Sequence, residues 1–168
     1  MSRRLILLAF VFLLLGCERG TTETGILQGA NTSAYVGSYK GVFSVAITVE
    51  AGNYGPKKFS SLPTTTLRVY EAGLAEFVLG GFVIPGIVSD NGQWQVDLGV
   101  NDLGNFIDSA SKDTLRQVGC PLDKRFARLS GQINPPSLSG QVADKLSCRV
   151  LMVPVGSIDI SGAVQAAR

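Results

Sequence analysis

The sequence predicts an all-β domain, either a small antiparallel β-barrel or a β-sandwich, with about eight strands. Twenty glycines and seven prolines, together with frequent Val, Ile, Phe and Thr, are typical of short strands joined by tight turns. Several segments alternate apolar and polar residues, and an amphipathic helical pattern is almost absent. Glycines inside the strand segments favour the tight curvature of a barrel.

The first predicted strand covers residues 39–50. Alternate apolar residues in this segment fall on one face, as expected for a strand with one buried side. These residues are Phe43, Val45, Ile47 and Val49. Residues 51–56, Ala-Gly-Asn-Tyr-Gly-Pro, then end the strand with a cluster of turn-forming residues.

The next segments predict further strands. Residues 65–70 form one strand. Residues 76–88 are apolar but are interrupted by Gly80-Gly81 and by Pro85-Gly86, so they form two strands or one bent strand.

The middle of the chain begins with a strong turn signal, Asp90-Asn91-Gly92. Residues 93–98 alternate again and predict a strand. Residues 101–125 are less regular: residues 105–108 are expected as a short strand, and residues 111–118 as one or two helical turns.

Three short segments in the last third of the chain are near copies of one another. Residues 129–133 read Leu-Ser-Gly-Gln-Ile, residues 138–142 read Leu-Ser-Gly-Gln-Val, and residues 160–164 read Ile-Ser-Gly-Ala-Val. Each predicts a strand in which glycine replaces a bulky side chain. Because the spacing is unequal and the segments are short, we interpret them as ordinary strand composition and not as a repeat domain.

The N-terminus predicts an export signal. A short positive start containing Arg3 and Arg4 is followed by an uninterrupted apolar run, residues 5–15, and then by Gly16. The apolar run would form a helix of about 16 Å, which is too short for a hydrocarbon core of roughly 30 Å. We therefore expect residues 1–16 to be a helical signal peptide. A twin-arginine signal is the second interpretation.

The segment Leu14-Leu15-Gly16-Cys17 resembles the lipobox of bacterial lipoproteins. The resemblance covers residues 1–17 and implies that Cys17 carries diacylglycerol, with fatty acyl chains such as palmitate, and becomes the new N-terminus. It implies a cell-envelope protein anchored to a membrane. With Glu18 next to the cysteine, the periplasmic face of the outer membrane is expected in a cell with two membranes. The alternative is ordinary cleavage elsewhere, which leaves a free thiol.

Composition divides the remaining chain and limits its partners. Residues 17–37 are rich in Gly, Thr, Ser and Asn and predict a lipid-anchored flexible tether with a reach of about 25 Å; an ordered first strand near residues 26–27 is the alternative. Residues 38–168 are the predicted β-rich domain. The chain has 15 basic and 13 acidic residues, and Arg3 and Arg4 account for the difference. A domain without net charge has no overall electrostatic field that would attract nucleic acid.

The two remaining cysteines, Cys120 and Cys148, predict a disulfide, because an even pair in an exported chain is normally oxidised. In the chain-entropy model such a bond contributes about 3.6 kcal/mol. Two buried free thiols are the alternative.

The sequence argues against most catalytic chemistry and predicts no cofactor. It contains no histidine, which excludes Ser-His-Asp and Cys-His catalysis and histidine-ligated zinc. Ser109-x-x-Lys112 and Ser89-Asp90-Asn91 resemble motifs of penicillin-recognising serine enzymes, but their order is reversed and no Lys-Thr-Gly follows. A Ser-Lys hydrolase is therefore only a remote alternative.

Two polar groups of residues could serve as binding sites, although turns and solvated surface are the expected roles of both. The first could offer oxygen ligands to calcium, but its spacing does not fit an EF-hand; it comprises Asp90, Asn91, Asp97, Asn101, Asp102, Asn105 and Asp108. The second is a basic cluster that could meet lipid headgroups or an acidic partner; it comprises Arg116, Lys124, Arg125 and Arg128.

The segment Gly37-Ser38-Tyr39-Lys40-Gly41 is similar to the opening of lipocalin-like barrels, with Tyr39 in place of tryptophan. The expected function is a non-enzymatic envelope lipoprotein. The first hypothesis is a binding module for a lipid or another small hydrophobic ligand. The alternative is a structural or assembly accessory that holds another envelope protein by a sheet edge or by the basic cluster. A hollow interior would favour the first hypothesis, and a filled interior with an exposed strand edge the second.

Overall fold

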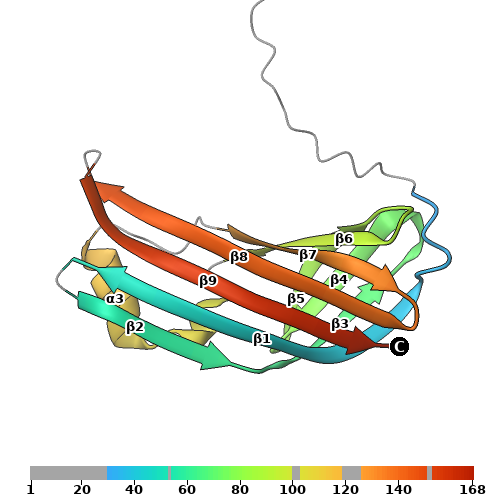
Figure 1. Ribbon diagram of the computed structural model, residues 1–168, viewed down its shortest axis with the longest axis horizontal. Helices are drawn as coiled ribbons and strands as arrows, with labels where there is room; N and C mark the ends of the chain where they lie inside the picture. The colour runs from blue at the N-terminus through green and yellow to red at the C-terminus, as the bar shows by residue number, and fades with distance from the viewer. Residues whose placement is uncertain (1–29, 53, 100–102, 119–125, 151–152) are drawn as a thin grey trace, which may run out of the picture.

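In the part of the chain that the structure describes, the protein is a β-barrel with the α-helix α3 at one end (Figure 1). The computed structural model describes residues 30–168, except residues 53, 100–102, 119–125 and 151–152. The strands are β1 (Gly37–Ala51), β2 (Tyr54–Ser61), β3 (Thr64–Val69), β4 (Leu74–Leu79), β5 (Phe82–Val88), β6 (Gln93–Gly99), β7 (Phe126–Asn134), β8 (Ser137–Val150) and β9 (Val153–Ala167). The helices are η2 (Glu71–Gly73), η3 (Gly104–Phe106) and α3 (Ser109–Gln117). Within these described residues, no helix has the length and hydrophobicity needed to cross a membrane.

The barrel closes because β1 pairs with a strand on each of its edges. Strands β3 to β9 follow one another around the sheet, each antiparallel to the next, and β9 then pairs with β1. This gives a closed antiparallel barrel of eight strands. The predicted all-β class is thus confirmed, and of the two predicted architectures the barrel is the one observed.

Strands β2 and β3 share the same edge of β1. Residues 37–42 of β1 pair with β3, and the half of β1 that begins at Val45 pairs with β2. The chain bends between the two strands at Pro63, whose carbonyl oxygen accepts a hydrogen bond from the backbone of Phe43 at 2.9 Å. Strand β2 thus extends the wall of the barrel beyond β3.

Apolar side chains occupy the inner surface of the barrel. Every second residue of β1 from Phe43 to Ala51 is buried, as the alternation in the sequence predicted. At the centre, the ring of Phe77 lies 6.1 Å edge-to-face from Phe43 and 6.2 Å from Trp94 in a stacked arrangement. In the described part of the chain, no buried side-chain nitrogen or oxygen lacks a hydrogen-bond partner.

Helix α3 lies at one end of the barrel and buries Leu115 there. The carboxylate of Asp108 caps the helix by accepting a hydrogen bond from the backbone N–H of Ser111 at 2.7 Å. The Lys57 ammonium, which forms an ion pair with Asp108, and this N–H lower the pKa of the carboxyl to about 2. The cap is therefore ionised at any physiological pH.

The opposite end of the barrel is closed by residues 30–36 and the C-terminus. The Thr32 hydroxyl donates to the Tyr70 carbonyl oxygen at 3.0 Å and accepts from the Gly73 N–H at 3.2 Å. The Arg168 guanidinium donates to the carbonyl oxygen of Val36 and lies 5.8 Å from the ring centre of Tyr39. Thr32 falls within the segment predicted as a tether, so the packed part of the chain begins before residue 38.

One of the element predictions was wrong, two others were confirmed, and one strand was not predicted. Residues 76–88 form two strands, β4 and β5, joined by Gly80-Gly81, which was one of the two alternatives. Residues 105–108 were expected as a strand, but η3 and the cap of α3 occupy this stretch; the helix predicted at 111–118 is present as α3. Strand β2 was not predicted, because its polar sequence Tyr-Gly-Pro-Lys-Lys-Phe-Ser-Ser lacks the alternation of a buried strand.

Candidate functional site

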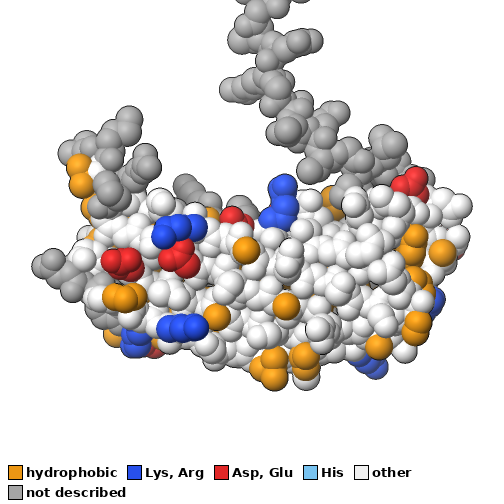
Figure 2. Space-filling view, viewed as in Figure 1, with side chains coloured by type: hydrophobic (Ala, Val, Ile, Leu, Met, Phe, Trp, Pro, Cys, Tyr) orange, Lys and Arg blue, Asp and Glu red, His pale blue; other side chains and the backbone are white. Residues whose placement is uncertain are grey.

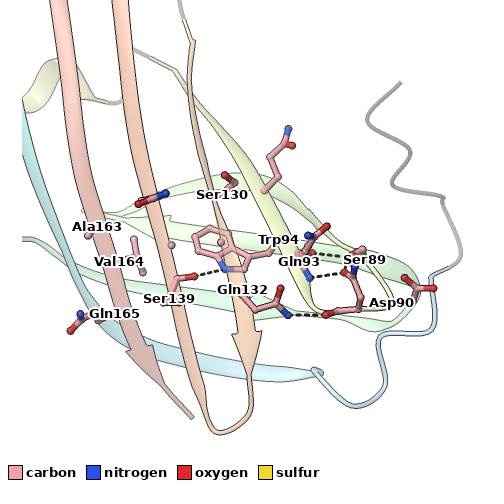
Figure 3. A pocket seen from close by; sticks show the side chains of 15 residues that line it. Ser89, Asp90, Gln93, Trp94, Ser130, Gln132, Ser139, Ala163, Val164 and Gln165 are labelled. Carbon is pink, nitrogen blue, oxygen red and sulfur yellow. Dashed lines mark hydrogen bonds between the residues drawn. The ribbon is translucent and has the colours of Figure 1, made fainter. Parts of the chain in front are cut away.

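A groove on the outer surface of β6, β7, β8 and β9 is the candidate functional site (Figure 3). Its volume is about 870 Å³, within the range of small-molecule sites. We call it the Gln/Ser groove after the residues of its walls. The walls, together with an end formed by the β5–β6 turn, comprise Ser89, Asp90, Asn91, Gln93, Gln95, Ser130, Gln132, Ser139, Gln141, Ala163 and Gln165.

Strand register arranges the wall residues in two rows that cross the strands. In the first row Gln95 lies opposite Ser130, and Ser130 lies opposite Gln141. The second row crosses all four strands, with each residue paired to the next. Its members, in order from β6 to β9, are Gln93, Gln132, Ser139 and Gln165. Since the rows are two residues apart along each strand, about 7 Å separates them.

Two glycines form the floor between the rows. Gly131 and Gly140 pair with each other, and they lie at positions where a side chain would point into the barrel. A Cβ atom on Gly131 would lie 2.0 Å from the Ser139 carbonyl oxygen, and a Cβ atom on Gly140 would lie 2.3 Å from a ring carbon of Trp94. Only glycine allows this close approach, which draws the wall inward and leaves the groove outside.

Trp94 supports the floor from inside the barrel. Its side chain is 1% exposed, and its indole N–H donates to the Ser139 carbonyl oxygen at 3.0 Å (Figure 3). The indole therefore fixes β6 against β8 beneath the two glycines. It does not present its ring to a ligand in the groove.

Most of the amides in the groove are available to a ligand. Gln132 is the exception, because its side-chain N–H groups reach the carbonyl oxygens of Asn91, at 2.7 Å, and of Ile133, at 3.2 Å. For the other four glutamine side chains, no hydrogen bond occurs within the described residues. These are Gln93, Gln95, Gln141 and Gln165. Each amide has two N–H donors and one carbonyl acceptor to offer.

The groove is almost free of charge. Asp90, at the end of the groove, is the one ionisable residue among those that line it in the described part of the chain. On the adjoining row, Asp97 and Arg128 neutralise each other in an ion pair of 3.1 Å. Figure 2 shows mostly uncharged surface along the middle of β8 and β9. The electrostatic potential of the groove therefore favours neither an anion nor a cation.

The turn before β6 forms a fixed end of the groove. The side-chain oxygen of Asn91 accepts hydrogen bonds from the hydroxyl of Ser89 and from the N–H of Gln93, the latter at 3.1 Å (Figure 3). Ser89-Asp90-Asn91 is thus an ordinary turn, as expected. Ser109 and Lys112 lie on α3, which follows the far end of β6. The structure does not bring the two halves of the serine-enzyme pattern together.

The cysteines predicted as functional are only partly described. Cys17 and Cys120 lie outside the described residues, and so do Lys124 and Arg125 of the basic cluster. Cys148 is completely buried on β8. The predicted pairing of Cys120 with Cys148 stays a prediction.

Most of the described members of the other predicted clusters have partners of their own, and Asn101 and Asp102 lie outside the described residues. Arg116 pairs with Asp113 at 3.3 Å, and Arg128 pairs with Asp97, so these two arginines do not form a common basic patch. No group of acidic or cysteine residues suited to a metal ion occurs within residues 30–168 as far as they are described. The carboxylate of Asp108 is used as a helix cap.

A second candidate surface is an apolar strip on the outside of β4 and β5. Leu74 and Val83 are 54% and 55% exposed, and Phe82 at the hairpin turn is 43% exposed. Strand β5 pairs with β6 only at residues 86–88, and the other half of β5 borders a shallow hollow of about 500 Å³. Pro85 explains the early end of this ladder, since it has no N–H to donate.

Comparison with known proteins does not place the chain in a family. No family model matches it, and a search of curated proteins gives no significant match.

The sequence held one signal of the groove. Ser-Gly-Gln occurs at residues 130–132 and again at 139–141, and each copy is three residues from Pro135-Pro136 at the turn between β7 and β8. This spacing places glycine opposite glycine and serine opposite glutamine in a hairpin. The interpretation as ordinary strand composition missed this arrangement.

Proposed function

We propose that this protein is a non-enzymatic, lipid-anchored binding module of the bacterial cell envelope, which holds a neutral polar ligand in its Gln/Ser groove. The observation that carries the proposal is the double row of amides and hydroxyls over a glycine floor, in which every amide except that of Gln132 has no hydrogen-bond partner among the described residues. The apolar ligand first expected has less support, since aromatic and aliphatic side chains occupy the interior of the barrel. We therefore place the ligand site on the outer surface of the barrel and not in its interior.

The membrane anchor is the first part of the proposal to test. Intact mass spectrometry of protein extracted from membranes should show the loss of residues 1–16 and the addition of diacylglycerol on Cys17. Two or more acyl chains anchor a protein stably, whereas one binds only marginally. Cys17→Ala should release the domain or leave an uncut precursor. A soluble wild-type protein with an unmodified Cys17 would contradict the anchor.

The same preparation tests the pairing of Cys120 with Cys148. After digestion without reductant, one peptide pair should be joined through these two residues, because the compartment is oxidising and Cys148 is buried in the wall. Reduction should separate the pair. Two alkylated, unlinked peptides from protein that was never reduced would show that the cysteines are core thiols.

The groove is tested by the class of ligand that it accepts. The probes are maltohexaose and an uncharged Gln/Ser peptide as neutral polar molecules, a heparin hexasaccharide, an oligolysine, and palmitate. NMR spectra of the lipidated full chain, in micelles of a sugar-free detergent, report the side-chain amides of the groove directly. We expect these signals to shift with a neutral probe and to stay in place with the other three. A response to palmitate alone would reject the proposal.

The second candidate function is an accessory that holds another envelope protein. The exposed side chains of the strip on β4 and β5 favour it, because exposed apolar surface beside an incomplete ladder is typical of strand-addition sites. Signals from Leu74 and Val83 in the same spectra separate the two functions. Shifts confined to the strip on addition of any probe would favour the accessory.

A further inference from the structure

We infer that the ligand of the Gln/Ser groove is an uncharged linear glycan that lies across the strands. This inference rests on the proposed function, because it names the class of neutral polar ligand. Its evidence is the direction of the rows, the use of the backbone groups in this wall, and the chemistry of the wall residues.

The backbone of the wall is not available to an added strand. From β6 to β9, each strand pairs along the groove with its neighbours, and β9 also pairs with β1. A peptide that binds by strand addition needs a free edge parallel to its own direction. The groove instead crosses the strands, so a ligand in it is recognised by side chains.

The dimensions of the groove fit an extended chain. The second row of wall residues runs over four strands, which at about 4.8 Å per strand gives a length of about 14 Å. The two rows flank the floor at Gly131 and Gly140, and no side chain rises between them. A linear polymer can therefore make repeated contacts along both of its edges.

The wall residues match the edges of a sugar chain. Sugar hydroxyls both donate and accept hydrogen bonds, and so do the amides of Gln95, Gln141 and Gln165 and the hydroxyls of Ser130 and Ser139. The Gln/Ser groove also carries small apolar surface at Ala163, and Val42, 40% exposed, lies beside Gln165 on β1. These can contact the C–H faces of the rings. Because the walls are uncharged, we expect a glycan without carboxylate or sulfate groups.

The experiment is calorimetric titration of the lipidated full chain in a sugar-free detergent. The probes are maltohexaose, cellohexaose and chitohexaose, each beside its disaccharide, and an uncharged Gln/Ser peptide. At least one hexasaccharide should bind, and its disaccharide should bind about tenfold more weakly. The double variant Gln141→Ala/Gln165→Ala removes two hydrogen-bonding side chains and should weaken binding about 30-fold. Ala163→Glu places a charged side chain in the wall opposite Gln141 and should block the groove.

Gln117→Ala is the matched control, since Gln117 is an exposed glutamine on α3 at the other end of the barrel. It should bind the hexasaccharide like the wild type, and equal melting temperatures would show that all variants fold. Equal binding of di- and hexasaccharide, or binding of the peptide alone, would overturn the glycan inference and leave the proposed function standing. Hexasaccharide binding that Ala163→Glu leaves unchanged would overturn both, as would the failure of every neutral probe to bind.

Discussion

Gly131→Ala should destabilise the protein by about 3 kcal/mol, although it adds a single methyl group. The new Cβ atom would lie 2.0 Å from the carbonyl oxygen of Ser139 and 2.5 Å from the Cα atom of Gly140. Both atoms belong to backbone that is held in the β7–β8 ladder. No flexible side chain can move aside, so the two strands must separate at the floor of the groove.

Gly55→Ala is the matched control for this prediction. Gly55 is exposed on β2, and no atom lies within 4 Å of the position its Cβ would take. Its replacement should change the free energy of unfolding by less than about 0.5 kcal/mol. Chemical denaturation followed by the fluorescence of Trp94, the only tryptophan in the chain, measures both variants. Equal stability of the two variants would mean that the glycines of the floor are not needed for close strand approach.

The barrel could be predicted from local patterns because its strands repeat a strong two-residue signal. Residues 43–50 and 93–98 alternate along their whole length, and both lie in strands with one buried face. Strand β2 could not be found in this way. It adds to the outer half of β1 with few buried side chains, so its pairing depends on β1 and on no pattern of its own.

The candidate site was harder to predict than the fold, because it depends on register between strands. Glutamines and serines at alternate positions predict the solvent-facing side of a strand. In the structure these residues do face solvent. Their significance comes from Gly131 facing Gly140 and from Trp94 passing beneath Gly140. No property of a single strand shows that its polar residues line up with those of three neighbours.

The sequence also led us to expect a ligand inside the barrel, and side-chain volume explains why the structure points elsewhere. The similarity to lipocalin-like barrels concerned five residues at the start of β1. It contained no information about Phe43, Phe77 and Trp94, which come from three different strands and meet in the interior. Replacement of one of these rings tests the packing of the interior.

Phe77→Ala should destabilise the protein by about 4 kcal/mol, the largest effect that we expect from any single replacement. The Phe77 side chain is fully buried and contacts the rings of both Phe43 and Trp94. Its removal from a packed interior leaves a cavity that the closed ladder of the barrel cannot collapse to fill. The emission of Trp94 should also change, because the indole loses its stacked neighbour.

Phe82→Ala provides the same chemical change at the surface. Phe82 is 43% exposed at the turn between β4 and β5, so its loss should cost less than about 1 kcal/mol and leave the emission of Trp94 unchanged. Denaturant unfolding of the two variants against the wild type gives the comparison. A small and equal cost for both variants would mean that the barrel is loosely filled. That result would make an apolar ligand inside the barrel the better-supported hypothesis. It would also remove the reason for placing the binding site in the Gln/Ser groove.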